Sequence, residues 1–277
     1  MAAIDCAGKS LDLSHPCVMG IINVTPDSFS DGGDFLTPGN ALIQARRMVG
    51  EGADIIDVGG ESTRPGAMAV SQQQELDRVI PIISAISAEF PIPVSIDTTK
   101  AAVMREAVAA GAGFINDVMA LRAPGAVDAA SSAGVPVCLI HMQGEPRSMQ
   151  QDPCYQDVVT DVKAFFASRI EACLAGGISR DRLLLDPGFG FGKALEHNLD
   201  LLNNLSVFVD MGLPLLVGVS RKSMIGMILG GNPVRERLHG SIAAAVMAFE
   251  RGASILRVHD VRPTVEALKV VAAVRDR

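Results

Sequence analysis

The 277-residue sequence lacks the features that mark several specialised classes of protein. No stretch approaches ~18 uninterrupted apolar residues, so we expect no membrane-spanning helix. The opening segment MAAIDCAGKS contains an acidic residue and no apolar core, which argues against a secretion signal. The formal net charge of −7 leaves no diffuse basic face, and we therefore expect no general affinity for nucleic acid.

Cysteine is scarce and shows no pattern. The chain has five, an odd number, and none of them forms a C-x-x-C pair. Such a set predicts reduced, mostly buried thiols in a cytoplasmic protein. No linker, low-complexity tract or shift in composition marks a boundary, so we expect a single domain over residues 1–277. A chain of this length can bury a core that needs no disulfides.

Short apolar runs that end in polar residues recur along the chain. Most are continuous rather than alternating, which is typical of parallel strands covered on both faces. Helical patterns rich in Ala, Leu, Glu and Arg lie between them. A glycine at the join from helix to strand predicts a left-handed helix cap, and six positions fit: Gly52, Gly111, Gly134, Gly176, Gly212 and Gly252. The runs are 18–23, 54–59, 93–97, 114–118, 137–142, 183–188, 215–222 and 255–260.

The spacing of these eight runs indicates the fold class. Their polar tips recur about every 34 residues between Asn23 and His259, close to the ~30 residues of one βαβ step. Eight such steps predict an α/β protein with a (β/α)8 TIM barrel. A doubly wound sheet uses the same units and is the competing fold, but the sequence has no glycine-rich nucleotide fingerprint.

The polar tips predict a site, because barrel enzymes place their active sites at the carboxyl ends of the strands. One group follows runs three, four, six and seven and could read the edge of a flat polar heterocycle, since a carboxylate matches an N–C–N unit bidentately. A second group, from runs one, two and eight, is rich in donors and, with Asp31, suits a diphosphate and its magnesium ion. The first group is Asp97, Asn116, Asp186 and Lys222; the second is Asn23, Thr63, Arg64, Arg257 and His259.

Several of these residues have alternative interpretations. Lys222 could be a solvated tip or the Schiff-base lysine of an aldolase, and Asp57 could simply bridge strands. His141 has no partner at zinc-ligand spacing, so we expect no zinc site. The run GFGFGK fails both phosphate-loop patterns, and we interpret it as a flexible loop that carries Phe189 and Phe191 toward the pocket mouth.

Taken in order, eight segments from about Val18 to Arg277 resemble the dihydropteroate synthase family, in its bacterial housekeeping form. They are GIINVTPDSFSDGG, DIIDVGGESTRPGA, VSIDTTK, FINDV, LIHMQGEP, LLLDPGFGFGK, LVGVSRKSMIG and LRVHD. The resemblance implies a barrel that joins 7,8-dihydropterin-6-ylmethyl diphosphate to 4-aminobenzoate, with Mg²⁺ assisting diphosphate departure. It also implies a homodimer and, because the TRPG and DSFSDGG patterns are kept, a chain inhibited by sulfonamides.

The resemblance assigns roles to matching positions. It implies a pterin site at Asp97, Asn116, Asp186 and Lys222. It places the diphosphate at Thr63, Arg257 and His259, and the magnesium ion at Asn23 and Asp31. The 4-aminobenzoate pocket falls on Phe29, Arg64, Pro65, Phe191 and Ser223. The residues expected to carry catalysis are Asn23, Asp31, Arg64, Lys222, Arg257 and His259.

The connection over residues 24–37 is longer than the ~2–6 residues of an ordinary βα loop. We interpret it as a lid, from which Asp31 reaches the metal and Phe29 closes over the aminobenzoate. Two further functions share the pterin constellation. A methyltetrahydrofolate-binding methyltransferase barrel would lack the SFSDGG and STRPG loops, and a non-catalytic pterin-binding protein would release no diphosphate.

Overall fold

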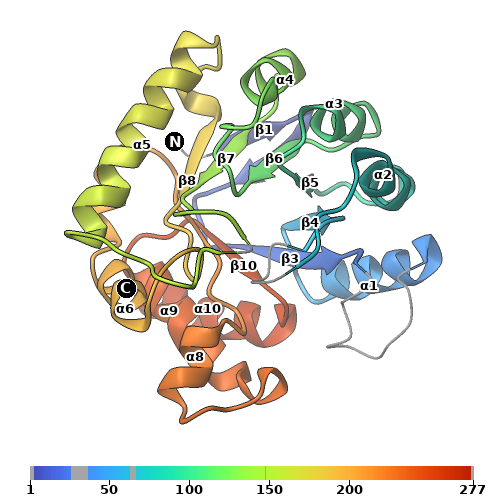
Figure 1. The fold of residues 1–277 in the computed structure, drawn as a ribbon. Helices are drawn as coiled ribbons and strands as arrows, with labels where there is room; N and C mark the ends of the chain where they lie inside the picture. The colour runs from blue at the N-terminus through green and yellow to red at the C-terminus, as the bar shows by residue number, and fades with distance from the viewer. Residues whose placement is uncertain (1–2, 26–36, 63–66, 147, 276–277) are drawn as a thin grey trace.

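The computed structural model describes residues 3–25, 37–62, 67–146 and 148–275. Eight parallel strands form a central barrel, and helices surround it (Figure 1). Each of the eight apolar runs supplies one strand, so the predicted (β/α)8 fold is confirmed. The strands are β3 (Cys17–Asn23), β4 (Ile55–Gly59), β5 (Val94–Asp97), β6 (Phe114–Asp117), β7 (Val137–Ile140), β8 (Leu183–Asp186), β9 (Leu216–Val217) and β10 (Ile255–Val258).

The sheet closes on itself, which decides against a doubly wound fold. Its strand order is β8-β7-β6-β5-β4-β3-β10-β9, with every neighbouring pair parallel. The two ends meet through a parallel bridge between Leu185 and Leu215, beside which the Leu185 amide donates to the Pro214 carbonyl at 3.0 Å. Strand ends that are distant in sequence therefore share one rim.

The helices cover the outside of the barrel because their apolar faces pack on the outward side chains of the strands. Side-chain caps fix where several begin, as at α2, where Ser71 and Gln74 form a capping box. Among the described residues, no helix is long and apolar enough to cross a membrane. The helices are α1 (Pro38–Gly50), α2 (Gln72–Glu89), α3 (Ala101–Ala109), α4 (Ala126–Ala133), α5 (Val158–Ala175), α6 (Leu195–Asn203), α7 (Ser206–Val209), α8 (Ser223–Ile228), α9 (Leu238–Glu250) and α10 (Val261–Arg275), with 3-10 turns η2 (Arg180–Arg182) and η3 (Val234–Glu236).

Glycines at the helix-to-strand joins behave largely as the sequence predicts. Five of them have positive φ: Gly52, Gly111, Gly134, Gly212 and Gly252. The sixth expectation, Gly176, is wrong, because its φ is −81° and the left-handed position falls one residue later, at Gly177. A side chain is strained in this region of φ, so these joins favour glycine.

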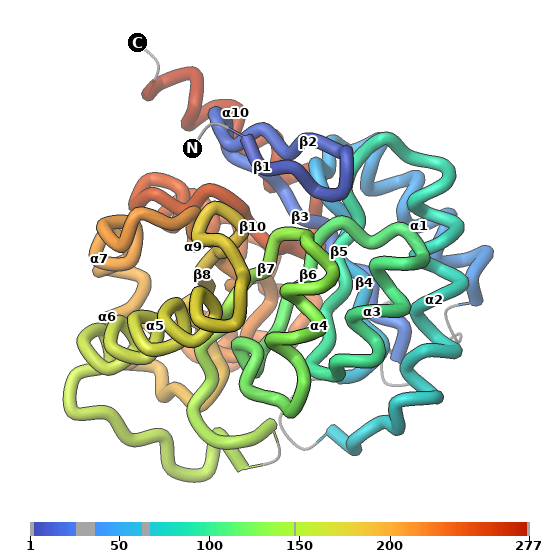
Figure 2. The backbone as a smooth tube through the Cα atoms, turned by 90° about the horizontal axis from the view of Figure 1, so that it is seen from above, coloured from blue at the N-terminus to red at the C-terminus, as the bar shows by residue number. Residues whose placement is uncertain are grey.

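An antiparallel hairpin that the sequence pattern did not predict closes the amino-terminal end of the barrel. It consists of β1 (Ala3–Cys6) and β2 (Lys9–Asp12) and lies across one end of the molecule, at the top of Figure 2. Its apolar side chains pack with the first inward residues of the barrel strands, including Met19 and Phe114. The approach is so close that a Cβ at Gly113 would lie 2.3 Å from the Cys6 carbonyl oxygen.

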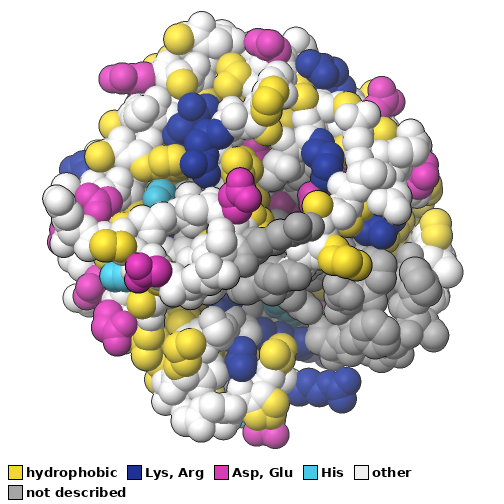
Figure 3. Space-filling view, viewed as in Figure 1, with side chains coloured by type: hydrophobic (Ala, Val, Ile, Leu, Met, Phe, Trp, Pro, Cys, Tyr) yellow, Lys and Arg dark blue, Asp and Glu magenta, His cyan; other side chains and the backbone are white. Residues whose placement is uncertain are grey.

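Charge is mixed over the face seen in Figure 3. The coloured Lys and Arg side chains alternate there with Asp and Glu side chains. All five cysteines are free thiols, and each except Cys154 is buried. The mostly buried set expected from the sequence is therefore confirmed.

Candidate active site

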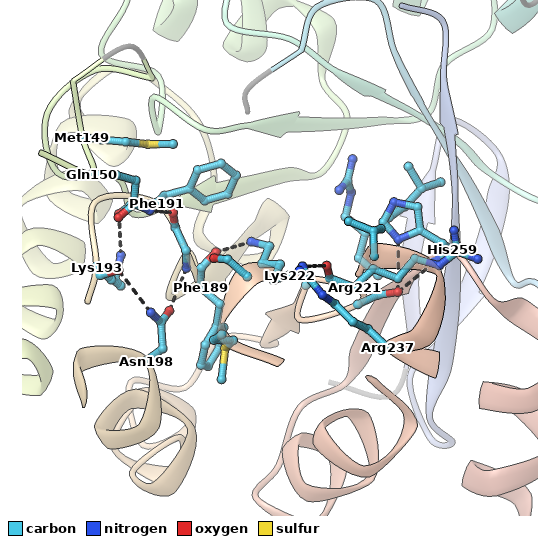
Figure 4. Close-up of a pocket in the computed structure, with 18 of the residues that line it drawn as sticks. Met149, Gln150, Phe189, Phe191, Lys193, Asn198, Arg221, Lys222, Arg237 and His259 are labelled. Carbon is cyan, nitrogen blue, oxygen red and sulfur yellow. Dashed lines mark hydrogen bonds between the residues drawn. The ribbon is translucent and has the colours of Figure 1, made fainter. Parts of the chain in front are cut away.

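A cavity of about 880 Å³ opens at the carboxyl ends of the strands. Residues that follow β3, β5, β8, β9 and β10 line it, and Figure 4 shows part of its wall. Seven residues expected from the sequence are among its lining side chains: Asn23, Asp97, Phe191, Lys222, Ser223, Arg257 and His259.

The strand register explains why these side chains converge. Asn23 pairs with Gly59, Gly59 with Asp97, and Asp97 with Asn116, so four neighbouring strands end in one layer. Gly59 contributes no side chain to this layer. A Cβ there would lie 3.8 Å from Asn23 Oδ1 and 3.9 Å from Asp97 Oδ2, so the missing side chain leaves these polar groups room to face the cavity.

Arg257 is held between two buried carboxylates. Its Nε donates to Asp57 Oδ2 at 2.6 Å, and its Nη2 donates to Asp97 Oδ2 at 2.8 Å. Burial opposes the arginine charge, but Asp57 and Asp97 outweigh it and raise the pKa of Arg257. Burial disfavours the charged form of Asp97 too and so raises the pKa of its carboxyl, while the Arg257 charge counteracts this rise. Asp57 therefore orients a cavity arginine as well as joining two strands.

Several buried polar atoms beneath the cavity have no hydrogen-bond partner within the described chain. They include both amide atoms of Asn116, the Ser95 hydroxyl and Oδ1 of Asp57. A buried polar atom without a partner is costly in a folded protein. Their placement beside Asp97 suits a ligand that brings both donors and acceptors.

Lys222 lines the cavity after β9, and its charge acts on Asp186 at the end of β8. Asp186 is buried, and its Oδ1 accepts from the Gly188 amide at 2.8 Å. Burial raises the pKa of Asp186, and the Lys222 charge counteracts it. Lys222 Nζ donates to the Phe189 carbonyl and lies 4.2 Å from the centroid of the Phe191 ring. Burial lowers the pKa of Lys222 to about 8, although Asp186 favours its charged form.

His259 lies at the end of β10 and shares the cavity with Ser220. The Ser220 hydroxyl is 3.1 Å from His259 Nδ1 and accepts from the His259 amide at 3.2 Å. Arg221, the next residue, has φ +57° and makes a two-pronged ion pair with Asp260. These contacts fix the turn from which Lys222 and Ser223 enter the cavity.

The Pterin binding enzyme family model matches residues 19–259. The dihydropteroate synthase of Escherichia coli (strain K12) is 56% identical over 266 residues, which span 96% of this chain and 94% of that relative. This chain belongs to the dihydropteroate synthase family. Dihydropteroate synthases are transferases, which decides against an aldolase built on Lys222. The 56% identity with a dihydropteroate synthase over 96% of the chain decides against the methyltransferase barrel.

Solved structures of dihydropteroate synthases agree with this assignment. The Yersinia pestis dihydropteroate synthase, solved as a sulfonamide drug complex, matches with a TM-score of 0.97 at 54% identity over 99% of this chain and 100% of that one. The dihydropteroate synthase of Xanthomonas albilineans, in complex with 7,8-dihydropteroate, matches with a TM-score of 0.89 at 49% identity, covering 99% and 98%.

Five residues assigned from the dihydropteroate synthase resemblance lie outside the described residues. They are Phe29, Asp31, Thr63, Arg64 and Pro65. Most of the segment interpreted as a lid falls there too, because residues 26–36 are not described. Asn116 and Asp186 are described and sit directly beneath the cavity rather than on its open wall.

One feature of the site differs from the sequence interpretation. Phe189 does not reach the pocket mouth, because its side chain is fully buried in the core and only its carbonyl faces Lys222. His141 is also buried, and its Nδ1 lies 2.8 Å from Nζ of Lys193. Lys193 was missed because a lysine beside glycines suggests a solvated loop, and the sequence does not show which carbonyls it meets.

Proposed function

We propose that this chain condenses 7,8-dihydropterin-6-ylmethyl diphosphate with 4-aminobenzoate to give 7,8-dihydropteroate and diphosphate. The observation that carries the proposal is the pairing of charges around one cavity: Asp186 faces Lys222, and Asp97 faces Arg257. Carboxylates and an amide can read the edge of a pterin, while the cations face a departing anion. The identity with dihydropteroate synthases over most of the chain supports the same reaction.

The pterin ring would lie at the buried end of the cavity. Asp186 offers a carboxylate that can accept from an amino group and an adjacent ring N–H. Asn116 offers one acceptor and two donors, both without a partner among the described residues. Lys222 would donate to ring acceptors in place of the Phe189 carbonyl. Binding would thus satisfy polar atoms that are otherwise buried without partners.

The diphosphate would lie toward β3 and β10. Arg257 and His259 face this part of the cavity, and Thr63 would join them. The described part of the proposed magnesium site is the Asn23 side chain, which lines the cavity at the end of β3. Mg²⁺ takes one or two protein oxygens together with phosphate oxygens and water, so an amide oxygen here fits, with Asp31 as the second ligand. The ion, when bound, would neutralise charge on the departing diphosphate.

The chemical step requires positioning more than acid–base catalysis. The bond between the pterin methylene carbon and the diphosphate oxygen breaks, and its electron pair leaves with the diphosphate. Arg257 would stabilise that anion. The amine of 4-aminobenzoate forms the new carbon–nitrogen bond and gives up one proton to solvent. Phe191 and Ser223, with Phe29, Arg64 and Pro65, would hold the amine in line and exclude water.

The direct test is incubation of the purified chain with both substrates and Mg²⁺. We expect dihydropteroate by mass spectrometry and an equal amount of released diphosphate. Omission of 4-aminobenzoate should stop product formation, and a chelator should slow it in proportion to the metal removed. Pterin binding without diphosphate release would instead identify a non-catalytic pterin-binding protein and overturn the proposal.

We also propose that the chain forms a homodimer through α9 and α10. Three apolar side chains are exposed on these neighbouring helices: Met247 at 41%, Val270 at 66% and Val274 at 73%. A patch of this kind suits a second copy of the chain. Sedimentation should give a dimer that Val270→Glu dissociates, whereas a monomeric wild-type chain would overturn the proposal.

A further inference from the structure

The run GFGFGK, residues 188–193, forms a loop between β8 and α6 that we call the glycine loop. Side chains hold every carbonyl of its first five residues. Lys193 donates to the Gly188 carbonyl at 2.9 Å and to that of Phe191 at 3.1 Å, and Lys222 donates to that of Phe189. Gln150 donates to the Gly190 carbonyl, and the Tyr155 hydroxyl donates to that of Gly192 at 2.8 Å. Side chains therefore determine the shape of this loop.

Lys193 lies underneath the glycine loop and is almost completely buried, with 3% of its surface exposed. Its Nζ also lies 2.8 Å from His141 Nδ1 and 3.4 Å from the His141 carbonyl. Burial lowers the pKa of His141 to about 2, and the Lys193 charge adds to the shift, so the imidazole is neutral and Nδ1 accepts. Burial lowers the pKa of Lys193 well below its ordinary value, and the Lys222 charge adds to the shift. In its charged form the side chain has three N–H donors, which match Nδ1 and the carbonyls of Gly188 and Phe191.

The fit around Lys193 leaves little room for adjustment. The loop lies so close to the segment after β7 that a Cβ at Gly188 would be 1.9 Å from the His141 carbonyl oxygen. Asn198 of α6 anchors the other side, where its Oδ1 accepts from the Gly190 amide at 2.7 Å. The glycine loop is thus clamped between β7 and α6, and Lys193 supplies the central contact.

The glycine loop determines where Lys222 lies in the cavity. The Nζ atom of Lys222 contacts two groups of the loop, the Phe189 carbonyl and the face of the Phe191 ring. Lys193 bonds to the carbonyls of Gly188 and Phe191, which lie on either side of Phe189 along the chain. Figure 4 shows Lys222 pointing toward Phe189 and Phe191, with Lys193 on the far side of the loop.

We propose that Lys193 is a positioning residue, which fixes the glycine loop so that the Phe189 carbonyl and the Phe191 ring hold Lys222 in the substrate cavity. Lys193 borders the cavity, but its Nζ bonds to His141 and to loop carbonyls, so it acts through these two groups. The inference rests on the proposed function, because Lys222 is assigned there to the pterin and Phe191 to the aminobenzoate. Loss of Lys193 should therefore weaken binding of both substrates while the barrel stays folded.

The decisive variant is Lys193→Met, which keeps the length of the side chain and removes its donors. We expect the KM values for both substrates to rise about tenfold, equivalent to the loss of one or two hydrogen bonds. The control is Lys163→Met, the same change at an exposed position of α5, which should leave both values unchanged. Circular dichroism at the assay temperature verifies that each variant is folded.

A pH profile separates positioning from a purely structural role. The titratable groups that face Lys222 are Asp186, Arg257, Asp97 and Lys193. Loosening the Phe189 carbonyl and the Phe191 ring removes two contacts that favour the charged form of Lys222. Burial lowers the pKa of Lys193 well below its ordinary value, so loss of this side chain removes little repulsion. The alkaline limb of pterin binding should therefore move to lower pH in Lys193→Met and stay in place in Lys163→Met.

Lys193→Gln is the second variant, in case Lys193→Met does not fold. Its shorter neutral amide reaches fewer of the three acceptors, so the KM values should rise at least about threefold and the alkaline limb should again move to lower pH. Wild-type KM values and an unmoved limb in a folded Lys193 variant would overturn the inference. Absence of turnover by the wild-type chain would instead contradict the proposed function, so the two failures are distinguishable.

Discussion

Arg257 on β10 and Asp97 on β5 form a hydrogen-bonded ion pair of 2.8 Å although they are 160 residues apart. In the closed sheet β3 and β4 lie between these two strands, so the contact crosses the barrel interior. Asp57 on β4 bonds to the same guanidinium at 2.6 Å. This three-residue network fixes the arginine before any ligand arrives, which is the condition for electrostatic stabilisation of a departing anion.

Replacing Asp57 by Ala should destabilise the chain, because it leaves a buried guanidinium with one partner instead of two. Breaking a buried pair typically costs about 3 kcal/mol, which urea unfolding would measure. Glu89→Ala removes the partner of Arg46 in an exposed pair and serves as the control, with little expected change. Equal stability of the two variants would contradict the interpretation of this network.

Asn116→Leu should weaken pterin binding without lowering the stability of the fold. Because the Asn116 amide has no partner among the described residues, an apolar side chain of similar size should leave the free energy of unfolding unchanged or raise it by about 1 kcal/mol. Pterin affinity, measured by calorimetry, should fall at least about tenfold. Asn198→Leu is the matched control. It removes three hydrogen bonds and should cost about 2 kcal/mol or more.

Pterin binding should weaken as pH rises through about 8. Burial lowers the pKa of Lys222 to about 8, so the ammonium that donates to the ring is present below this pH and lost above it. Calorimetric titrations between about pH 7 and about pH 10 would measure the effect. Lys222→Arg cannot lose its proton in this range, so its affinity should not fall with pH. An alkaline limb that persists in Lys222→Arg would assign the titration to another group.

Gly113→Ala should destabilise the junction between the amino-terminal hairpin and the barrel. The new Cβ would lie 2.3 Å from the Cys6 carbonyl oxygen, a backbone atom that cannot swing aside. Overpacking of this kind costs about 1–3 kcal/mol. Gly50→Ala, at the end of α1 with no atom within 4 Å of the new Cβ, should instead stabilise by up to about 1 kcal/mol. Denaturant titration of both variants checks the contrast.

Sulfonamides should inhibit the chain in competition with 4-aminobenzoate. The sequence keeps the TRPG and DSFSDGG patterns of the housekeeping form that it resembles. Raising the 4-aminobenzoate concentration should restore turnover, and steady-state kinetics at several inhibitor concentrations would give the inhibition constant. A constant in the range of resistant enzymes would contradict this prediction.

The sequence predicted the barrel and most of the described rim because both follow local rules. Continuous apolar runs form parallel strands, and their last residues, such as Asn23 and Asp97, must meet where those strands end in a closed sheet. The hairpin was missed because its strands alternate buried with exposed residues and contain no continuous apolar run. The sequence also could not show which buried side chains contact one another. Nothing in the run GFGFGK shows that Lys193 turns inward to His141, a contact that depends on how β7 and β8 pack.

The amino-terminal hairpin bears on how ligands reach the site. Ile4, Cys6 and Leu11 pack against the amino-terminal end of the barrel, so ligands reach the cavity from the carboxyl ends of the strands. Asn116 and Asp186, which we assign to the pterin, are buried, whereas Phe191 and Ser223, which we assign to the aminobenzoate, line the cavity. On this assignment the pterin would bind before the aminobenzoate, and the joined product would leave before the next pterin enters.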